Sequence, residues 1–306
     1  FYAEVTGNVI SDVRVGIQTG NYYRANTGAP ATLSDNQITA NRRGIFHNLH
    51  YSDASAFTIT GNIIIAQDLA TGTTFDGIML SSLQTAVDAI VTNNTITIGN
   101  ITQSPTTGYM IWNTPTTATL SVEGGTVSGA DYGVWVNNYE GYSSDAHSTS
   151  VTIDGVTITG AEIGVYVKDS PDNTNGATVS AIIKNNSITA ATGIKVEGAD
   201  ATASGDHNMV YATTDVENTN PVSMNFENNY WGSPCGATVV GVVDTIPWFE
   251  DEAMLVSKET NPSGNLTLTP DMTTLAINNT LACAAPYSTI TFTTTTEDVE
   301  YPGNII

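Results

Sequence analysis

Apolar residues along this chain follow two periods, one short and one long. Over short stretches apolar and polar residues alternate, as in Ser150–Ile153 and Gly164–Val167. Alternation in segments rich in Val, Ile and Thr predicts β-strands with one buried face. Over longer distances an Asn-x-Ile phrase, followed by Gly-Ile-x-Val, returns every 26 to 32 residues.

Seven apolar anchors mark the long period, and each has a glycine partner. The anchors are Ile10, Ile38, Ile64, Ile96, Val127, Ile158 and Ile188, and the partners are Gly16, Gly44, Gly77, Gly108, Gly133, Gly164 and Gly193. A fixed period of this size indicates stacked units, each too small to bury an apolar face alone. We therefore expect an all-β fold, a right-handed parallel β-helix of about eight coils with the anchors in one inward row.

Asparagines stand two residues before several anchors and recur in the last coil. They are Asn8, Asn36, Asn62, Asn94, Asn186 and Asn229. Asn tolerates left-handed turns and can bond to the equivalent amide of the next coil. Either these residues form a ladder of stacked amides or they are turn residues only. Gly125 and Val156 take the fifth and sixth positions, so a ladder would be interrupted there.

Composition limits the partners that this chain can have. Thirty Asp and Glu against eight Lys and Arg give a net charge of -22, which repels phosphate backbones and anionic lipids. Only 12% of the residues are charged, so Thr, Asn, Ser and Gly cover most of the surface, as in secreted β-solenoids. No apolar run reaches the length of about eighteen residues that spans a membrane. We expect a secreted or cell-surface protein that binds no nucleic acid and does not insert into membranes.

Metal and redox chemistry have little support in the sequence. Cys235 and Cys283 are the only cysteines, and they form either one disulfide or two buried thiols. They cannot build a structural zinc site alone, and we expect no cofactor. The segment Asp169–Gly176 is rich in oxygen ligands and could hold calcium, but its spacing does not match an EF-hand loop. A solvated turn is the competing interpretation.

Composition also divides the chain. We expect the β-helix to occupy residues 1–252, a linker rich in turn residues to occupy 253–265, and a partial β-sandwich-like domain to occupy 266–306. The chain begins without Met and ends inside an alternating pattern. We therefore expect it to be part of a longer chain.

The last coil carries a distinctive phrase. Asn228–Pro234 reads Asn-Asn-Tyr-Trp-Gly-Ser-Pro, and Asp244–Trp248 reads Asp-Thr-Ile-Pro-Trp. This resembles the last coil of right-handed β-helix domains of the pectin-lyase-like superfamily, especially those in large repetitive bacterial surface and adhesin-like proteins. The resemblance covers roughly residues 1–252 and implies a structural or adhesive role, although the superfamily also includes polysaccharide lyases, hydrolases and epimerases. Physically, Trp231 and Trp248 are expected to plug the open end of the core.

One row of large side chains is not needed for the core. The residue two positions after each glycine should face outward, and five consecutive coils place Phe46, Met79, Met110, Trp135 and Tyr166 there. We call these five residues the stripe. Contiguous exposed apolar surface usually marks a contact, and aromatic rings in a groove suit a polysaccharide chain or a protein partner. Alternatively, the long insertions near 65–76 and 97–107 fold over the stripe.

A cationic cluster near the start supplies the rival interpretation. Arg14 and Arg42 each stand two residues before a glycine, which places them on adjacent rungs, about 5 Å apart. Stacked cations need an anion between them, either a carboxylate of the chain or an acidic glycan. With His47 and Tyr51 nearby, they could serve a polysaccharide lyase or hydrolase. No set of converging carboxylates accompanies them, so our main expectation is a non-enzymatic structural or adhesive module. It would bind extracellular polysaccharide or other surface proteins through the stripe.

Overall fold

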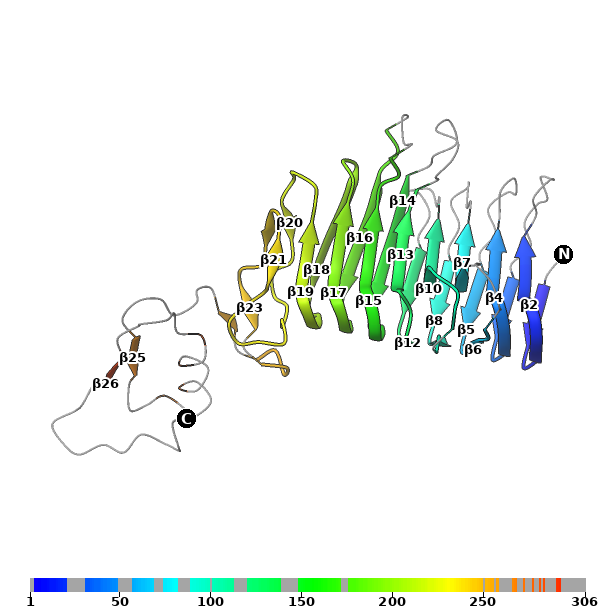
Figure 1. Cartoon of the computed structure of the whole chain (residues 1–306), viewed down its shortest axis with the longest axis horizontal. Coiled ribbons are helices and arrows are strands. Elements are labelled where there is room, and N and C mark those ends of the chain that lie inside the picture. The colour runs from blue at the N-terminus through cyan, green and yellow to red at the C-terminus, as the bar shows by residue number, and fades with distance from the viewer. Residues whose placement is uncertain are drawn as a thin grey trace.

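The structure is a computed structural model. It describes residues 3–20, 31–48, 57–68, 74–81, 89–99, 101–112, 120–138, 148–171, 176–249, 251–255, 257–258, 266–268 and 290–292, and the single residues 272, 277, 281 and 283. The described strands stack as successive coils of a β-solenoid, from the blue N-terminal end to the yellow coils in Figure 1. The predicted all-β fold of parallel stacked coils is therefore confirmed.

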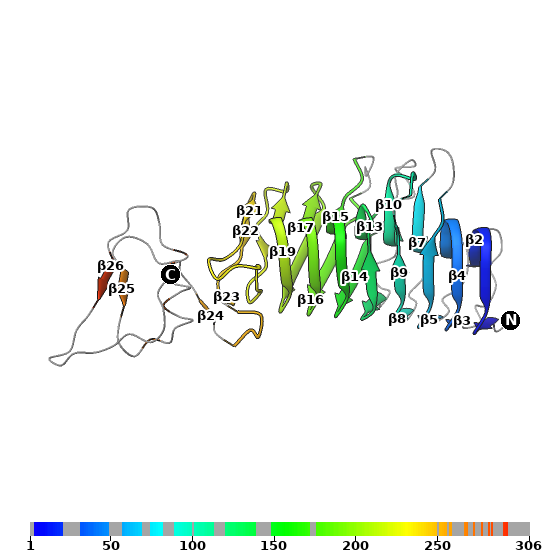
Figure 2. The same cartoon turned by 60° about the horizontal axis from the view of Figure 1, so that its bottom comes forward.

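Two parallel sheets run along the solenoid (Figure 2). The first, sheet A, has ten strands: β1 (Ala3–Thr6), β3 (Ala31–Ser34), β5 (Phe57–Thr60), β8 (Ala89–Thr92), β11 (Leu120–Glu123), β14 (Thr149–Asp154), β16 (Val179–Lys184), β18 (Ala201–Asp206), β20 (Met224–Asn225) and β22 (Val243–Asp244). The second, sheet B, has twelve: β2 (Val9–Gly20), β4 (Gln37–Asn48), β6 (Ile63–Ala66), β7 (Phe75–Ser81), β9 (Thr95–Thr97), β10 (Thr106–Trp112), β12 (Thr126–Ser128), β13 (Tyr132–Asn137), β15 (Thr157–Lys168), β17 (Ser187–Glu197), β19 (Met209–Asn218) and β21 (Val239–Val240).

The number of coils differs slightly from the expected eight. Sheet A stacks ten strands, but its last two, β20 and β22, have only two residues each. In most coils one long strand of sheet B makes a bend, whereas three middle coils break it into the pairs β6/β7, β9/β10 and β12/β13. The right-handedness of the coil stays a prediction.

The turn between the two sheets has the same build in every coil. Its first residue has a positive φ, from 54° to 67°, and is Gly7, Asp35, Gly61, Asn93, Gly124, Gly155, Asn185, His207 or Asn228. The second residue is usually the asparagine noted above. Asn36 shows the pattern, because its backbone N and its Nδ2 both donate to Asn62 Oδ1, at 3.1 and 2.9 Å.

The predicted asparagine ladder is confirmed, and it has two segments. The first joins Asn8, Asn36, Asn62 and Asn94, and the second joins Asn186, Asn208 and Asn229. Asn208 was not expected from the sequence. The gap falls at Gly125 and Val156, as predicted, although the backbone N of Val156 still donates to Asn186 Oδ1 at 2.8 Å.

The core is built from rows that run along the axis of the solenoid. The registers align Ile38, Ile64, Ile96, Val127, Ile158 and Ile188, all at most 1% exposed, which confirms the inward row. The partner glycines lie against this row. A Cβ on Gly133 would stand 2.6 Å from Ile158 Cγ2 and 2.5 Å from the carbonyl oxygen of Gly164. No side chain fits at that spacing, so the repeat needs glycine there.

The last coils close the core. Trp231 and Trp248 are buried within the hydrophobic core, as the plug prediction required. Trp248 belongs to β23 (Trp248–Phe249), which pairs antiparallel with β24 (Ser257–Lys258). Further along, β25 (Leu266–Leu268) pairs parallel with β26 (Ile290–Phe292). Cys235 and Cys283 form a disulfide with a Cα–Cα distance of 5.1 Å, which decides between the two alternatives for the cysteines.

The predicted division at residues 252, 253–265 and 266–306 stays a prediction, since most residues after 258 lie outside the described ranges. Within the described part of the chain, no helix has the length and apolar character needed to cross a bilayer.

Candidate functional site

The stripe occupies consecutive rungs of sheet B. Register pairs Phe46 with Met79, Met79 with Met110, Met110 with Trp135, and Trp135 with Tyr166. The expected alignment is therefore present. The side chains are less exposed than a bare surface row would be: Met79 and Tyr166 keep 4% and 7% of their surface, and the other three are half-buried.

Packing between neighbouring rungs explains this burial. The Trp135 and Tyr166 rings lie 5.7 Å apart and nearly parallel, and Tyr132 contacts both rings from the side. Tyr166 also donates its hydroxyl to Glu197 Oε2 at 2.8 Å. At the other end of the stripe, the Arg43 guanidinium lies 4.5 Å from the centroid of the Phe46 ring. The stripe is thus a continuous layer of stacked side chains with charged groups at both ends.

A cavity of about 190 Å³ opens on the middle of the stripe. We call it the stripe pocket; its lining includes Arg43, Asp76, Met79, Met110, Trp112, Trp135 and Asn137. Thr74 and Pro105, from two of the long connections, also line it. These described residues of the connections form walls beside the stripe. The alternative that the insertions fold over the stripe is therefore met in part.

The pocket contains a charged pair and two polar atoms without partners. Arg43 Nε donates to Asp76 Oδ2 at 3.2 Å, with side chains only 18% and 7% exposed. Burial raises the pKa of Asp76, and the Arg43 cation acts in the opposite direction. The indole Nε1 of Trp135 and Oδ1 of Asn137 are both buried without a hydrogen-bond partner. Such groups normally find a partner, and a polar ligand could supply both.

Three outward rows together form this surface. Arg43, Asp76 and Thr107 pair across one row, the stripe forms the second, and Ser81, Trp112 and Asn137 pair across the third. A central apolar row is therefore flanked by two rows that carry most of the hydrogen-bonding groups. Adjacent rungs lie about 4.8 Å apart, so any ligand lying along the axis meets these groups at a regular spacing.

Of the four proposed catalytic residues, Arg14, Arg42 and His47 lie within the described ranges, and the three differ in exposure. Arg14 is exposed and Arg42 half-buried. Burial is the main cause that lowers the pKa of Arg42. The nearby Arg43 and Arg14 cations lower it further, so the guanidinium groups interact. Asp76 forms its ion pair with Arg43 rather than Arg42. Tyr51 lies outside the described residues.

His47 lies in the core. Its side chain is 3% exposed, its register partners are Thr19 and Leu80, and its ring packs 4.1 Å from that of Phe57. Thr19 Oγ1 is 2.7 Å from Nδ1, and Nε2 is without a partner. Burial lowers the pKa of His47 to about 4. A base for glycan chemistry needs access to the substrate proton, and this position does not provide it.

No metal centre is apparent in the described ranges, where no three His, Cys, Asp or Glu side chains cluster. Asp169, the first residue of the oxygen-rich segment, is buried and accepts from Asn138 Nδ2 at 2.7 Å. Residues 172–175 lie outside the described ranges, so calcium binding there stays a prediction.

Sequence reasoning missed Arg43, Trp112 and Asn137. A signal for Arg43 was present: Arg43 and Asp76 each directly precede a glycine, Gly44 and Gly77, so aligning that position would have paired them. In comparisons with protein-family models, curated proteins and solved structures, nothing matches this chain.

Proposed function

We propose that this chain is a rigid adhesive module of a large secreted cell-surface protein, and that it binds an extracellular polysaccharide at the stripe pocket. The observation that carries the proposal is the coincidence, in one cavity, of apolar walls with unpaired polar groups. Met79, Met110 and Trp135 line it, and Trp135 Nε1 and Asn137 Oδ1 lack partners.

Sugars suit such a lining because they present both apolar and polar faces. Aromatic rings offer flat apolar area and, for Trp, an N–H donor. The pair Arg43–Asp76 offers further donors and acceptors at the edge. Binding pockets combine mostly apolar walls with a few placed polar groups, which is the composition found here.

A secreted location is supported by the chemistry of the chain. The Cys235–Cys283 disulfide is a bond that persists in oxidising compartments. The stacked parallel coils provide a stiff support, because each coil pairs with neighbours on both sides through two sheets. Together these features favour a spacer or adhesive segment over a cytoplasmic enzyme.

The test is a binding titration with defined polysaccharides, namely alginate, pectate and sulfated glycans, using Trp135 variants. Trp135→Ala removes the ring and the N–H, and we expect at least about tenfold weaker binding, since a buried aromatic anchor contributes 1.4 kcal/mol or more. Trp135→Phe keeps an aromatic surface without the donor, and its loss should be smaller. Ile90→Ala is the control, because the Ile90 side chain is exposed on sheet A, away from the stripe pocket.

Three outcomes would oppose the proposal. Binding to none of the glycans, or equal binding by Trp135→Ala and the wild type, would show that the stripe pocket is not a polysaccharide-binding site. Formation of unsaturated product, followed by absorbance and lost in folded Arg42→Ala, would replace adhesion by the alternative, a polysaccharide lyase.

A further inference from the structure

The row of glycines in sheet B ends at a carboxylate. Register pairs Ile194 with Val216, which sets Gly193 opposite Asp215. A Cβ on Gly193 would lie 2.6 Å from the carbonyl oxygen of Asp215, as it would from the next glycine in earlier coils. Asp215 thus takes the position that seven successive coils give to glycine.

Steric crowding ends at the same place. In earlier coils the branched anchor of the following coil fills the space in front of the glycine. After Val210 the next coil continues with Trp231 and then leaves the regular path through Gly232 and Ser233. A side chain is therefore tolerated at residue 215, yet Asp215 remains only 2% exposed.

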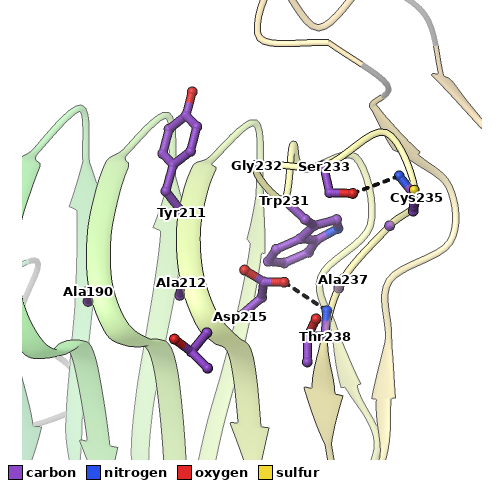
Figure 3. Close-up of a pocket in the computed structure, with 12 residues that line it drawn as sticks. Ala190, Tyr211, Ala212, Asp215, Trp231, Gly232, Ser233, Cys235, Ala237 and Thr238 are labelled. Carbon is purple, nitrogen blue, oxygen red and sulfur yellow. Dashed lines mark hydrogen bonds between the residues drawn. The ribbon is translucent and has the colours of Figure 1, made fainter. Parts of the chain in front are cut away.

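A cavity of about 580 Å³ lies in front of this carboxylate. It is lined by Asp215, Trp231, Ser233, Thr238 and Tyr211, among others, and Figure 3 shows the Asp215 carboxylate beside the Trp231 indole. The lining is rich in hydroxyl and backbone groups. None of the lining residues is a Lys, Arg or His.

The carboxylate is half satisfied. Asp215 Oδ2 accepts from the backbone N of Thr238 at 2.7 Å, while Oδ1 is buried without a hydrogen-bond partner. The indole Nε1 of Trp231 is also buried without a partner. Burial raises the pKa of Asp215 to about 6, although the amides of Thr238 and Ala212 act in the opposite direction. At neutral pH the cavity therefore holds a largely ionised carboxylate, with no Lys, Arg or His among the described residues that line it.

A second charge at the rim of this cavity is also negative. Tyr211 donates its hydroxyl to Glu252 Oε1 at 2.7 Å at the rim. A ligand that satisfies Oδ1 must donate a hydrogen, and the negative surroundings favour a cation. Walls with several hydroxyl groups suit a ligand that itself carries many hydroxyl groups better than they suit the alkyl chain of a lysine residue.

We propose that this cavity binds a protonated amino sugar, with its ammonium group on Asp215 Oδ1 and its ring hydroxyls on Trp231 Nε1 and Ser233. Two unpaired buried atoms of opposite hydrogen-bonding type in one cavity then gain partners together. The site is separate from the stripe pocket, shares no lining residue with it, and does not depend on the proposed function.

Glucosamine and N-acetylglucosamine form a matched pair of probes. They share the ring, but acetylation removes the positive charge. We expect glucosamine to bind at pH 7 in a calorimetric or NMR titration, and N-acetylglucosamine to bind at least about tenfold more weakly, the loss expected for a hydrogen bond to a charged group. Nα-acetyl-lysine methylamide tests a lysine side chain as the source of the ammonium.

Asp215→Asn is the decisive variant, because it keeps the shape and removes the charge. Glucosamine affinity should fall at least about tenfold, whereas Asp244→Asn, an exposed carboxylate in β22, should bind like the wild type. Circular dichroism checks that both remain folded. As a second measurement on the wild type, glucosamine affinity should fall as the pH is lowered through 6; Glu252 and Tyr211 are the other ionisable groups at the rim.

Three results would overturn the proposal: equal affinity for the two sugars, undiminished binding by folded Asp215→Asn, or tighter binding of the lysine derivative than of glucosamine. If Asp215→Asn fails to fold, affinity that does not change through pH 6 refutes the proposal in its place.

Discussion

Replacing Asp215 by Asn should make the closing coils more stable at neutral pH, even though it replaces one carboxylate oxygen with a buried NH2 group. The carboxylate has a pKa of about 6 in the folded chain against 3.8 for an ordinary Asp. At 1.36 kcal/mol per pKa unit, this difference corresponds to about 3 kcal/mol. Because the folded pKa is raised, the penalty is complete above pH 6 and declines as the pH falls, disappearing below the unfolded value of 3.8.

The measured quantity is the difference between wild type and variant at two pH values. Near pH 4 both residues are neutral in the folded state and only a small part of the charge penalty remains, so their difference in stability reflects mainly shape and hydrogen bonding. At pH 8 the variant should gain about 2–3 kcal/mol relative to that baseline. Any effect of the amide introduced at residue 215 on the hydrogen bond from Thr238 that does not vary with pH cancels in this comparison.

Hydrogen exchange of peptides covering β19 is the suitable assay, since the units of a solenoid can open from an end without unfolding the whole. Wild type and variant are compared at the same pH, with Asp244→Asn as the control for net charge. A difference in protection between wild type and variant that is the same at pH 4 and pH 8, or a variant that is less protected at pH 8, would refute this prediction. The carboxylate would then stabilise the coil through its hydrogen bond from Thr238 and carry no penalty for its buried charge.

Two further predictions concern the repeat itself. Asn62→Ala should lower stability by about 3 kcal/mol or more, because it strands several buried donors and acceptors at about 1–3 kcal/mol each; thermal unfolding followed by circular dichroism measures it, and exposed Gln37→Ala serves as the control. A loss equal to that control would mean that the ladder is only a turn preference. Gly133→Ala should cost about 1–3 kcal/mol through overpacking against Gly164, while Gly99→Ala, whose Cβ meets nothing within 4 Å, should change little in the same melts. Equal melting temperatures for the two alanine variants would contradict the crowding argument.

The regular part of the fold could be predicted because every coil repeats the same physical constraint. The anchors and glycines recur at a nearly constant spacing, so their inward row followed directly from the sequence. Asn208 escaped because the later coils are shorter: it lies 22 residues after Asn186, well below the usual period. Its predecessor, His207, also replaces the more familiar Gly or Asn of the turn.

The candidate sites were only partly predictable. The stripe was found because its members occupy one position of the repeat. The polar half of the stripe pocket was not, since Asn137 and Arg43 matter only through what they meet on neighbouring rungs. Asp215 was missed for a similar reason. In the sequence it is an ordinary Asp between Thr214 and Val216, and its position in the glycine row appears only once the register of the short last coils is known.

The gap in the asparagine ladder has a mechanical consequence for the solenoid. Between Asn94 and Asn186 the ladder has no Asn–Asn side-chain bond at Gly125 and Val156, while the backbone pairing continues through Thr126 and Thr157. At this turn adjacent coils are therefore joined by fewer hydrogen bonds than on either side. In a chain of nearest-neighbour units, an opening that starts at one end tends to stop at the weakest joint. The solenoid should accordingly behave under tension as two cooperative blocks in series, so that one can yield while the other stays folded.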